Sequence, residues 1–115
     1  MSKGIKILNP NYYVLKLDGR IIGISGLYYD YEDPKDVMWM DYLAVSPMFQ
    51  GQGYGALILG NLERICRKKK VRLLCVFTDN KKAQSFYSKM GFVGAGRIKD
   101  YYSKSKDKAW MYKEL

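Results

Sequence analysis

The feature that most constrains the fold of this 115-residue chain is a glycine-rich loop between an apolar run and an amphipathic stretch. The run over residues 38–45 is typical of a strand, and apolar residues recur at helical spacing over residues 54–69. Between them, Gly51, Gly53 and Gly55 alternate with other residues. A strand, a glycine loop and a helix point unpaired backbone N–H groups at an anion, and glycine lets a phosphate approach them. The segment therefore predicts a phosphate-binding loop.

Two familiar phosphate motifs fit this loop poorly. The spacing Gly51-x-Gly53-x-x-Ala56 matches a dinucleotide fingerprint, with Asp79 as its ribose-binding acid. Too little chain follows Ala56, however, for the doubly wound sheet that positions a dinucleotide. A P-loop is excluded, because no Gly-Lys-Ser/Thr follows the glycines.

A third motif matches better, and a second string supports it. The pattern Gln/Arg-x-x-Gly-x-Gly/Ala stands at residues 50–55, preceded by Leu-Ala-Val-x-Pro at residues 43–47. The string Asn-x-x-Ala-x-x-Phe-Tyr-x-Lys-x-Gly-Phe follows at residues 80–92, one predicted strand further on. Both strings, in this order, resemble the two signatures of the GCN5-related N-acetyltransferase (GNAT) superfamily. The resemblance covers residues 12–115.

The periodicity along the chain predicts an α/β fold. A hairpin is expected at Asp18-Gly19-Arg20 and a turn at residues 9–11. The resemblance implies a GNAT-like mixed, mostly antiparallel sheet with splayed central parallel strands and two main helices. Residues 1–115 are expected to form a single N-acetyltransferase domain, since the chain has room for one core. Strands are expected over residues 5–8, 12–17, 21–28, 38–45, 72–77, 93–101 and 109–113, and helices over 54–69 and 81–90.

The chain departs from the GNAT pattern near its start. Family members usually carry one or two helices between the first two strands, and these helices help to wall the acceptor site. Here only residues 9–11 separate the two predicted strands. The chain is then either a minimal or truncated form, or a partner subunit, such as a second copy in a homodimer, completes the site. An open, shallow acceptor pocket is expected.

The net charge of +9 favours an anionic partner: nucleic acid, an acidic protein surface or coenzyme A. The densest cluster, residues 67–70, ends the predicted helix, on the order of 20 Å from its N-terminus. It therefore cannot bind the pyrophosphate, and is either a solvated surface or a site for an acidic partner. Nucleic acid ranks last, because the aromatic residues follow core-like patterns rather than flanking this cluster.

Composition and the placement of cysteines indicate the cellular compartment and whether a metal site is expected. The apolar runs fall short of the about 20 residues that span a bilayer, and no secretory signal opens the chain, so no membrane partner is expected. Cys66 and Cys75 lie in apolar patterns and are expected to be buried free thiols in a reducing cytosol, which predicts a cytoplasmic protein. With no histidine and no cysteine pair at ligand spacing, no metal site is expected.

The resemblance implies acetyl-CoA as cofactor and direct attack of a neutral primary amine on its thioester in a ternary complex. Backbone groups at the strand end would pair with the pantetheine arm, and the glycine loop would bind the pyrophosphate. Asn80 matches a cofactor-contacting position, although a helix cap explains it equally well. The expected cofactor-binding residues are Leu43, Ala44, Val45, Gln50, Gly51, Gln52, Gly53, Tyr54, Gly55, Ala56, Asn80 and Tyr87.

Two residues are expected to be catalytic. Tyr87 matches the family's general acid, which protonates the leaving thiolate, although a packed aromatic side chain is the alternative. Relatives that acetylate protein N-termini use a glutamate as base where this chain has Cys75. Another variant places the acid on the preceding strand, where Asp41 would share a face with Leu43 and Val45. Asp41 would deprotonate the amine through water, attract a cationic substrate, or merely pair with a lysine.

The sequence indicates the acceptor amine less closely than it indicates the cofactor. The segment at residues 96–102 resembles the last hairpin of the branch that acetylates N-terminal amines, which favours a peptide or protein amine over a small amine or polyamine. Cys75 argues against that branch. Acidic residues at positions 30–36 would recruit a positively charged acceptor or simply be solvated. The alternative function is a non-catalytic CoA-binding or accessory module whose basic face binds an acidic partner.

Overall fold

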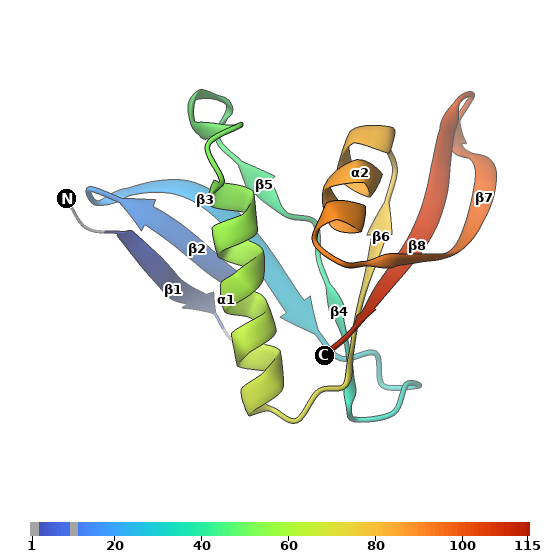
Figure 1. The fold of residues 1–115 in the computed structure, drawn as a ribbon, viewed down its shortest axis with the longest axis horizontal. Helices are drawn as coiled ribbons and strands as arrows, with labels where there is room; N and C mark the ends of the chain where they lie inside the picture. The colour runs from blue at the N-terminus through green and yellow to red at the C-terminus, as the bar shows by residue number, and fades with distance from the viewer. Residues whose placement is uncertain (1–2, 10–11) are drawn as a thin grey trace.

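The computed structural model describes residues 3–9 and 12–115, which form a twisted sheet with two α-helices (Figure 1). The helices are α1 (Tyr54–Lys68) and α2 (Lys81–Lys89), and a short 3-10 helix, η1, spans Pro47–Phe49. The strands are β1 (Lys3–Asn9), β2 (Tyr12–Leu17), β3 (Arg20–Tyr28), β4 (Val37–Met40), β5 (Ala44–Val45), β6 (Leu73–Thr78), β7 (Val93–Ser103) and β8 (Lys106–Glu114).

The strand order in the sheet is β1-β2-β3-β4-β6-β8-β7, and β5 pairs with β3 beside this path. Only β4 and β6 run parallel among the described strands; every other pairing is antiparallel. The predicted mixed, mostly antiparallel sheet with two main helices is therefore confirmed. The predicted turn at residues 9–11 falls partly on residues 10 and 11, which lie outside the described residues.

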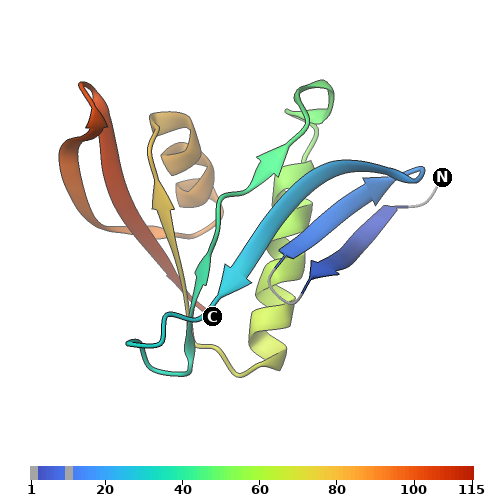
Figure 2. The ribbon, with the colours of Figure 1, turned by 180° about the vertical axis from the view of Figure 1, so that it is seen from behind.

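The two parallel strands separate in the middle of the sheet (Figure 2). β4 and β6 pair from Val37 and Leu73 as far as Met40 and Val76. Beyond that point β5 pairs with β3, whereas β6 continues beside β8. The two diverging strands form a V, which is the predicted splay.

The continuous strand predicted over residues 38–45 was wrong, because the strand is interrupted at residues 41–43. The backbone N–H of Asp41 donates to the carbonyl of Gly26 at 2.9 Å. The Asp41 side chain then accepts from the N–H of Tyr42, also at 2.9 Å. The bond to Gly26 keeps the chain beside β3, which pairs with both β4 and β5, whereas the pairing with β6 ends at Met40.

Local sequence explains both helices and the first hairpin. Asp18 and Gly19 adopt positive φ values of 50° and 80°, which suits a tight turn between β2 and β3. α1 begins after Gly53, and α2 begins after Asn80, whose side chain accepts from the N–H of Ala83 at 2.7 Å. Gly91, at φ 96°, follows α2. Both helices end one residue before the predicted position.

α1 packs directly on β3 and forms the centre of the core. Ile58 and Leu62 of α1 are fully buried. A Cβ atom built on Gly23 of β3 would lie only 2.5 Å from Cδ1 of Ile58, so glycine is what allows this close approach. The buried cluster also contains side chains from β2, β4, β6 and β8, including Leu15, Met38, Met40, Leu74, Val76 and Met111.

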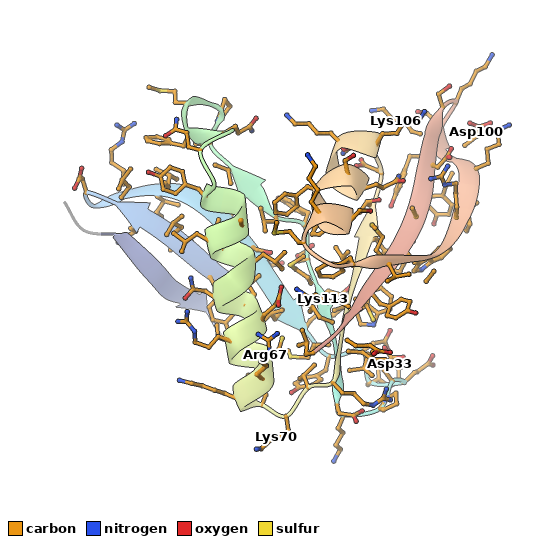
Figure 3. The ribbon with its side chains drawn as sticks, viewed as in Figure 1. Asp33, Arg67, Lys70, Asp100, Lys106 and Lys113 are labelled. Atoms are coloured by element: carbon orange, nitrogen blue, oxygen red, sulfur yellow. The ribbon has the colours of Figure 1, made fainter. Side chains whose placement is uncertain are left out.

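A partly buried ion pair between Glu63 and Lys113 ties α1 to β8, and Figure 3 labels Lys113 and the nearby Arg67. Nζ of Lys113 lies 3.0 and 3.1 Å from the two carboxylate oxygens of Glu63, and it also donates to the carbonyl of Met90 at 2.7 Å. Arg67 approaches the same carboxylate at 3.4 Å. The pair therefore joins α1, β8 and the end of α2 at one point.

The basic cluster at residues 67–70 is exposed and lies at the end of α1 opposite Gly53. Because the cluster lies at the opposite end of α1, it is not expected to contact a ligand bound at the glycine loop. Within residues 3–9 and 12–115, neither helix has the length and apolar character needed to cross a membrane.

Candidate active site

The glycine loop is held by its own side chains and opens onto the start of α1. Gly51 and Gly53 have φ values of 75° and 87°, where a residue with a side chain would be strained. The side-chain amide of Gln50 donates to the carbonyl of Val45 at 2.9 Å, and that of Gln52 donates to the carbonyl of Met48 at 3.2 Å. No side chain caps α1, so the N–H groups of Gly55 and Ala56 in its first turn have no intrahelical partner.

A cleft of about 570 Å³ extends from this loop along α2; we name it the loop cleft. Its walls are mostly apolar, and among the described residues Lys82 is the only charged side chain that lines it. The predicted residues Ala44 and Gln52 do not line it. The residues that line it are Leu43, Val45, Phe49, Gln50, Gly51, Gly53, Tyr54, Gly55, Ala56, Asn80, Lys82, Ala83, Phe86 and Tyr87.

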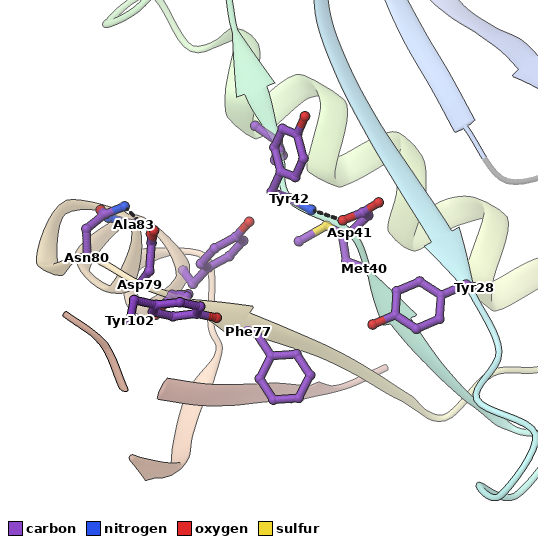
Figure 4. A pocket seen from close by; sticks show the side chains of 12 residues that line it. Tyr28, Met40, Asp41, Tyr42, Phe77, Asp79, Asn80, Ala83 and Tyr102 are labelled. Carbon is purple, nitrogen blue, oxygen red and sulfur yellow. Dashed lines mark hydrogen bonds between the residues drawn. The ribbon is translucent and has the colours of Figure 1, made fainter. Parts of the chain in front are cut away.

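A second cleft, of about 500 Å³, lies on the other side of α2; we name it the tyrosine cleft. Figure 4 shows Asp79, Asn80 and Tyr102 on one wall and Tyr28, Asp41 and Tyr42 on the other. Two carboxylates line it, and no lysine or arginine of the part of the chain that the structure describes does. The remaining lining residues are Met40, Leu43, Phe77, Thr78, Ala83 and Tyr87.

The two clefts meet where β4 and β6 diverge. Leu43, Asn80, Ala83 and Tyr87 line both of them. A molecule in the loop cleft and another in the tyrosine cleft would therefore meet at this shared wall. The structure places Asp41 in the tyrosine cleft and most of the glycine loop in the loop cleft, so all of the predicted site residues except Ala44 and Gln52 line one of these two adjoining clefts.

Tyr87 is a packed aromatic side chain that also lines both clefts. It is 4% exposed, and its ring lies 5.3 Å from that of Phe86 and 5.2 Å from that of Phe92. Burial raises its pKa to about 12, since the phenolate is poorly solvated there. The hydroxyl therefore keeps its proton throughout the neutral range. Its role as a general acid stays a prediction.

Asn80 acts as a helix cap, because its side-chain oxygen accepts from the N–H of Ala83 and its amide donates to Asp79 at 2.8 Å. Although it caps α2, Asn80 also lines both clefts. Contact with a cofactor stays a prediction for this residue.

Asp41 lies at the strand interruption rather than within a strand. The alternation that placed it on a face with Leu43 and Val45 therefore does not apply. Its carboxylate accepts from the hydroxyl of Tyr12 at 2.8 Å, and this hydrogen bond raises the pKa of Tyr12. The carboxylate thus stays in the cleft wall, held by Tyr12 and by the N–H of Tyr42.

In the described part of the structure, the chain that follows Asp41 has one edge without a neighbouring strand, where the side-chain amide of Gln50 donates to the carbonyl of Val45. β5 pairs with β3 through Ala44 and Val45, and no described strand pairs with its other edge. An extended ligand amide is able to hydrogen-bond such an edge. The backbone predicted to bind the cofactor arm is therefore accessible from the V between β5 and β6.

Sequence reasoning missed several residues of both clefts. Phe49, Lys82 and Phe86 line the loop cleft, and Lys82 was detectable because it follows the predicted cap of α2. Most of the tyrosine cleft was also missed, because its residues come from strands far apart in the sequence. In the acidic loop, Asp33 accepts from the indole N–H of Trp39 at 2.7 Å and Asp36 pairs with Arg72 at 2.8 Å.

Comparisons with known proteins agree with this geometry. The sequence profile of the Acetyltransferase (GNAT) family matches residues 5–92. The IAA acetyltransferase from Bacillus cereus ATCC 14579 is 24% identical, with a TM-score of 0.77 over 90% of this chain and 77% of that one. A GNAT family acetyltransferase from Elizabethkingia anophelis with acetyl-CoA bound is 24% identical, with a TM-score of 0.79 over 90% and 75%.

A third solved structure, the ribosomal-protein-S18-alanine N-acetyltransferase from Escherichia coli, is 22% identical, with a TM-score of 0.79 over 90% of this chain and 68% of that one. The chain belongs to the GNAT acetyltransferase family, as predicted. Members of this family are acetyl-CoA-dependent N-acetyltransferases, so the enzyme class and the cofactor predicted from the two motifs are confirmed.

Proposed function

We propose that this protein transfers the acetyl group of acetyl-CoA, bound in the loop cleft, to a primary amine bound in the tyrosine cleft. The observation that carries the proposal is the contrast in charge between two clefts that share one wall. The loop cleft has a helix N-terminus and Lys82, which suit a polyanion. The tyrosine cleft has two carboxylates and no basic side chain, which suit a cationic amine.

The residues of the loop cleft fit the chemistry of acetyl-CoA. The positive φ values of Gly51 and Gly53 keep side chains away from the loop, so the backbone N–H groups of the first turn of α1 would hold the pyrophosphate. The free edge of residues 43–45 would pair with the amide groups of the pantetheine arm. The apolar side chains of Leu43, Val45 and Phe86 would cover that arm.

When bound, acetyl-CoA supplies an activated acetyl group, and attack by a neutral amine forms a C–N bond while the C–S bond breaks. Tyr87 would give its proton to the departing sulfur and regain one from solvent, since its raised pKa keeps it protonated beforehand. Asp41 would accept the proton that the amine loses, through a water molecule, with Tyr12 holding the carboxylate. The proton that Asp41 takes up balances the one that Tyr87 regains, so transfer from a neutral amine releases no net proton.

The first test is the thermal unfolding shift on adding acetyl-CoA, with NAD and ADP as controls. Ligand at about 100 times its dissociation constant should stabilise the folded state by about 2.7 kcal/mol, or several degrees. A shift with acetyl-CoA, together with CoA release when amines are added, is the expected result. Binding without release by any amine would leave a non-catalytic CoA-binding module.

The second test addresses the acid. Tyr87→Phe removes only the hydroxyl and should lower kcat by about 10²–10⁴ while the acetyl-CoA-induced thermal shift persists. Tyr31→Phe is the matched control, because Tyr31 is 93% exposed and lines neither cleft. Equal turnover in Tyr87→Phe and Tyr31→Phe would refute the assignment of Tyr87.

A further inference from the structure

We infer that the acceptor is a small amine that carries a second positive charge, such as a linear diamine, with Asp79 binding the charge that is not acetylated. The inference rests on the proposed function and deepens it by naming the substrate class of the tyrosine cleft. It follows from the charge of the cleft, from its aromatic walls and from one buried hydroxyl that lacks a partner.

The charge of the tyrosine cleft is opposite to that of the whole chain. The protein has a net charge of +9, yet the cleft walls contain Asp41 and Asp79 and no lysine or arginine. Figure 4 places these two carboxylates on opposite walls. Burial raises the pKa of Tyr28 in the same wall, and the charges of Asp41 and Asp30 raise it further, so the negative potential extends over this side of the cleft.

Two separated carboxylates call for two cationic groups. Asp41, held by Tyr12, lies in the wall formed by β3 and the end of β4 and serves the amine that reacts. Asp79 is exposed at the opposite wall, where the side-chain amide of Asn80 donates to it at 2.8 Å. A carboxylate in that position is able to pair with a ligand ammonium group, since opposite charges attract at short range.

The aromatic walls suit an alkylammonium ion. Tyr28, Tyr42 and Tyr102 present ring surface to the cleft, and aromatic faces attract ammonium groups. Phe77 is less available, because its ring stacks on Trp39 at 4.6 Å and holds Nζ of Lys108 at 4.4 Å. Lys108 itself does not line the cleft.

Thr78 supplies an independent sign of a ligand. It is 5% exposed and lines the tyrosine cleft, and its hydroxyl oxygen is buried without a hydrogen-bond partner in the described structure. A buried hydroxyl without a partner is costly, and such groups are normally satisfied by the protein, water or a ligand. Thr78 lines the same cleft as Tyr87, so a polar ligand bound in the tyrosine cleft is the partner that we infer for this hydroxyl.

The same features argue against an acceptor with a carboxylate. No basic side chain lines the cleft to neutralise it, and Asp41 and Asp79 would repel it. A free amino acid is therefore expected to be a poorer acceptor than an amine of equal length with a neutral end.

The experiment compares amines of matched length by kcat/KM, measured as CoA release at pH 7.5: 1,4-diaminobutane, butylamine and 4-aminobutanoate. The diamine is expected to exceed butylamine at least tenfold, and 4-aminobutanoate to be the poorest. Asp79→Asn should reduce the ratio of diamine to butylamine toward one. Asp18→Asn, in the β2–β3 turn outside both clefts, is the control and should leave the ratio unchanged.

Binding is measured separately from turnover, by calorimetric titration of 1,4-diaminobutane into the protein saturated with CoA. Binding that is lost in Asp79→Asn supports the inference even if chemistry is slow. Equal kcat/KM for diamine and butylamine, or a preference for 4-aminobutanoate, overturns the inference while leaving the proposed function intact. No CoA release with any amine, despite acetyl-CoA binding, overturns the proposed function.

Thr78→Val tests the hydroxyl. Valine has the same shape and lacks the unpartnered oxygen, so the variant should unfold at an equal or higher temperature while its KM for the diamine rises. A variant that is less stable and has an unchanged KM would assign the hydroxyl to the fold instead of the ligand.

Discussion

Replacing Lys113 with methionine should lower the free energy of unfolding by about 3–5 kcal/mol, because it leaves the Glu63 carboxylate buried without its main counter-charge. The Glu63 side chain is 8% exposed, and after the change its nearest cation is Arg67 at 3.4 Å. Methionine keeps an unbranched chain in place of lysine, so packing changes little. The carbonyl of Met90 also loses a donor at 2.7 Å, which adds about 1 kcal/mol.

The variant Glu63→Leu/Lys113→Met separates charge from packing. It contains no uncompensated buried charge, and hydrophobic replacement of a buried pair is often neutral or stabilising. We therefore expect it to be more stable than Lys113→Met alone, despite carrying one more substitution. If each substitution destabilised the fold independently, the double variant would instead be less stable than Lys113→Met.

The measurement is urea unfolding followed by circular dichroism. With a slope of about 1–3 kcal/mol per molar urea, a loss of about 3 kcal/mol lowers the midpoint by about 1 M or more. Lys106→Met, at the exposed start of β8, is the control and should stay within about 0.5 kcal/mol of the parent. The reasoning fails if Lys113→Met unfolds at the same midpoint as Lys106→Met, or if the double variant is the least stable of the set.

Three further changes test other features. Gly23→Ala should destabilise by about 1–3 kcal/mol in the same urea assay, since the new methyl would lie 2.5 Å from Ile58 Cδ1; an unchanged midpoint would show that Ile58 moves freely. Asn80→Ala should cost about 1 kcal/mol through loss of the cap, and a larger drop in acetyl-CoA affinity than in stability would reveal a separate contact. Stability should fall as pH rises from about 9 to 12, because burial raises the pKa of Cys66 to about 11 and that of Tyr87 to about 12, so the unfolded chain ionises first. Tyr87 contributes about 3 kcal/mol to this loss between pH 10 and 12, and Tyr87→Phe should flatten that part of the profile.

Local signals in the sequence account for most of the fold. Both helices begin where predicted, since Gly53 and Asn80 mark their starts, and the Asp18-Gly19 turn has the positive φ values that such a pair favours. The interruption at residues 41–43 was not predictable from alternation. It arises where the chain parts from β6, which is distant in sequence, and where the side chain of Asp41 accepts from the N–H of Tyr42.

The candidate site also contains one part that the sequence predicted and one part that it did not. The loop cleft is built largely from residues 43–56 and from the second motif, so the resemblance to the family predicted ten of its lining residues, eight of them in residues 43–56. The tyrosine cleft combines side chains from β3, β6 and β7, and nothing local in the sequence links Tyr28 to Tyr102. The burial of Glu63 was missed for the same reason, because its partner Lys113 is fifty positions away.

The exposed strand β7 has a consequence for handling the protein. It forms an outer edge of the sheet, and all 11 of its residues are exposed. Its pairing with β8 is irregular between Ile98 and Ser103, where Asp100 has a φ of 53°, and Arg97 and Lys99 add positive charge. A bent, charged border is a poor template for a strand of another molecule. Because about 1 M salt shortens the range of charge repulsion to about 3 Å, concentrated solutions should resist sheet-to-sheet aggregation best at low ionic strength.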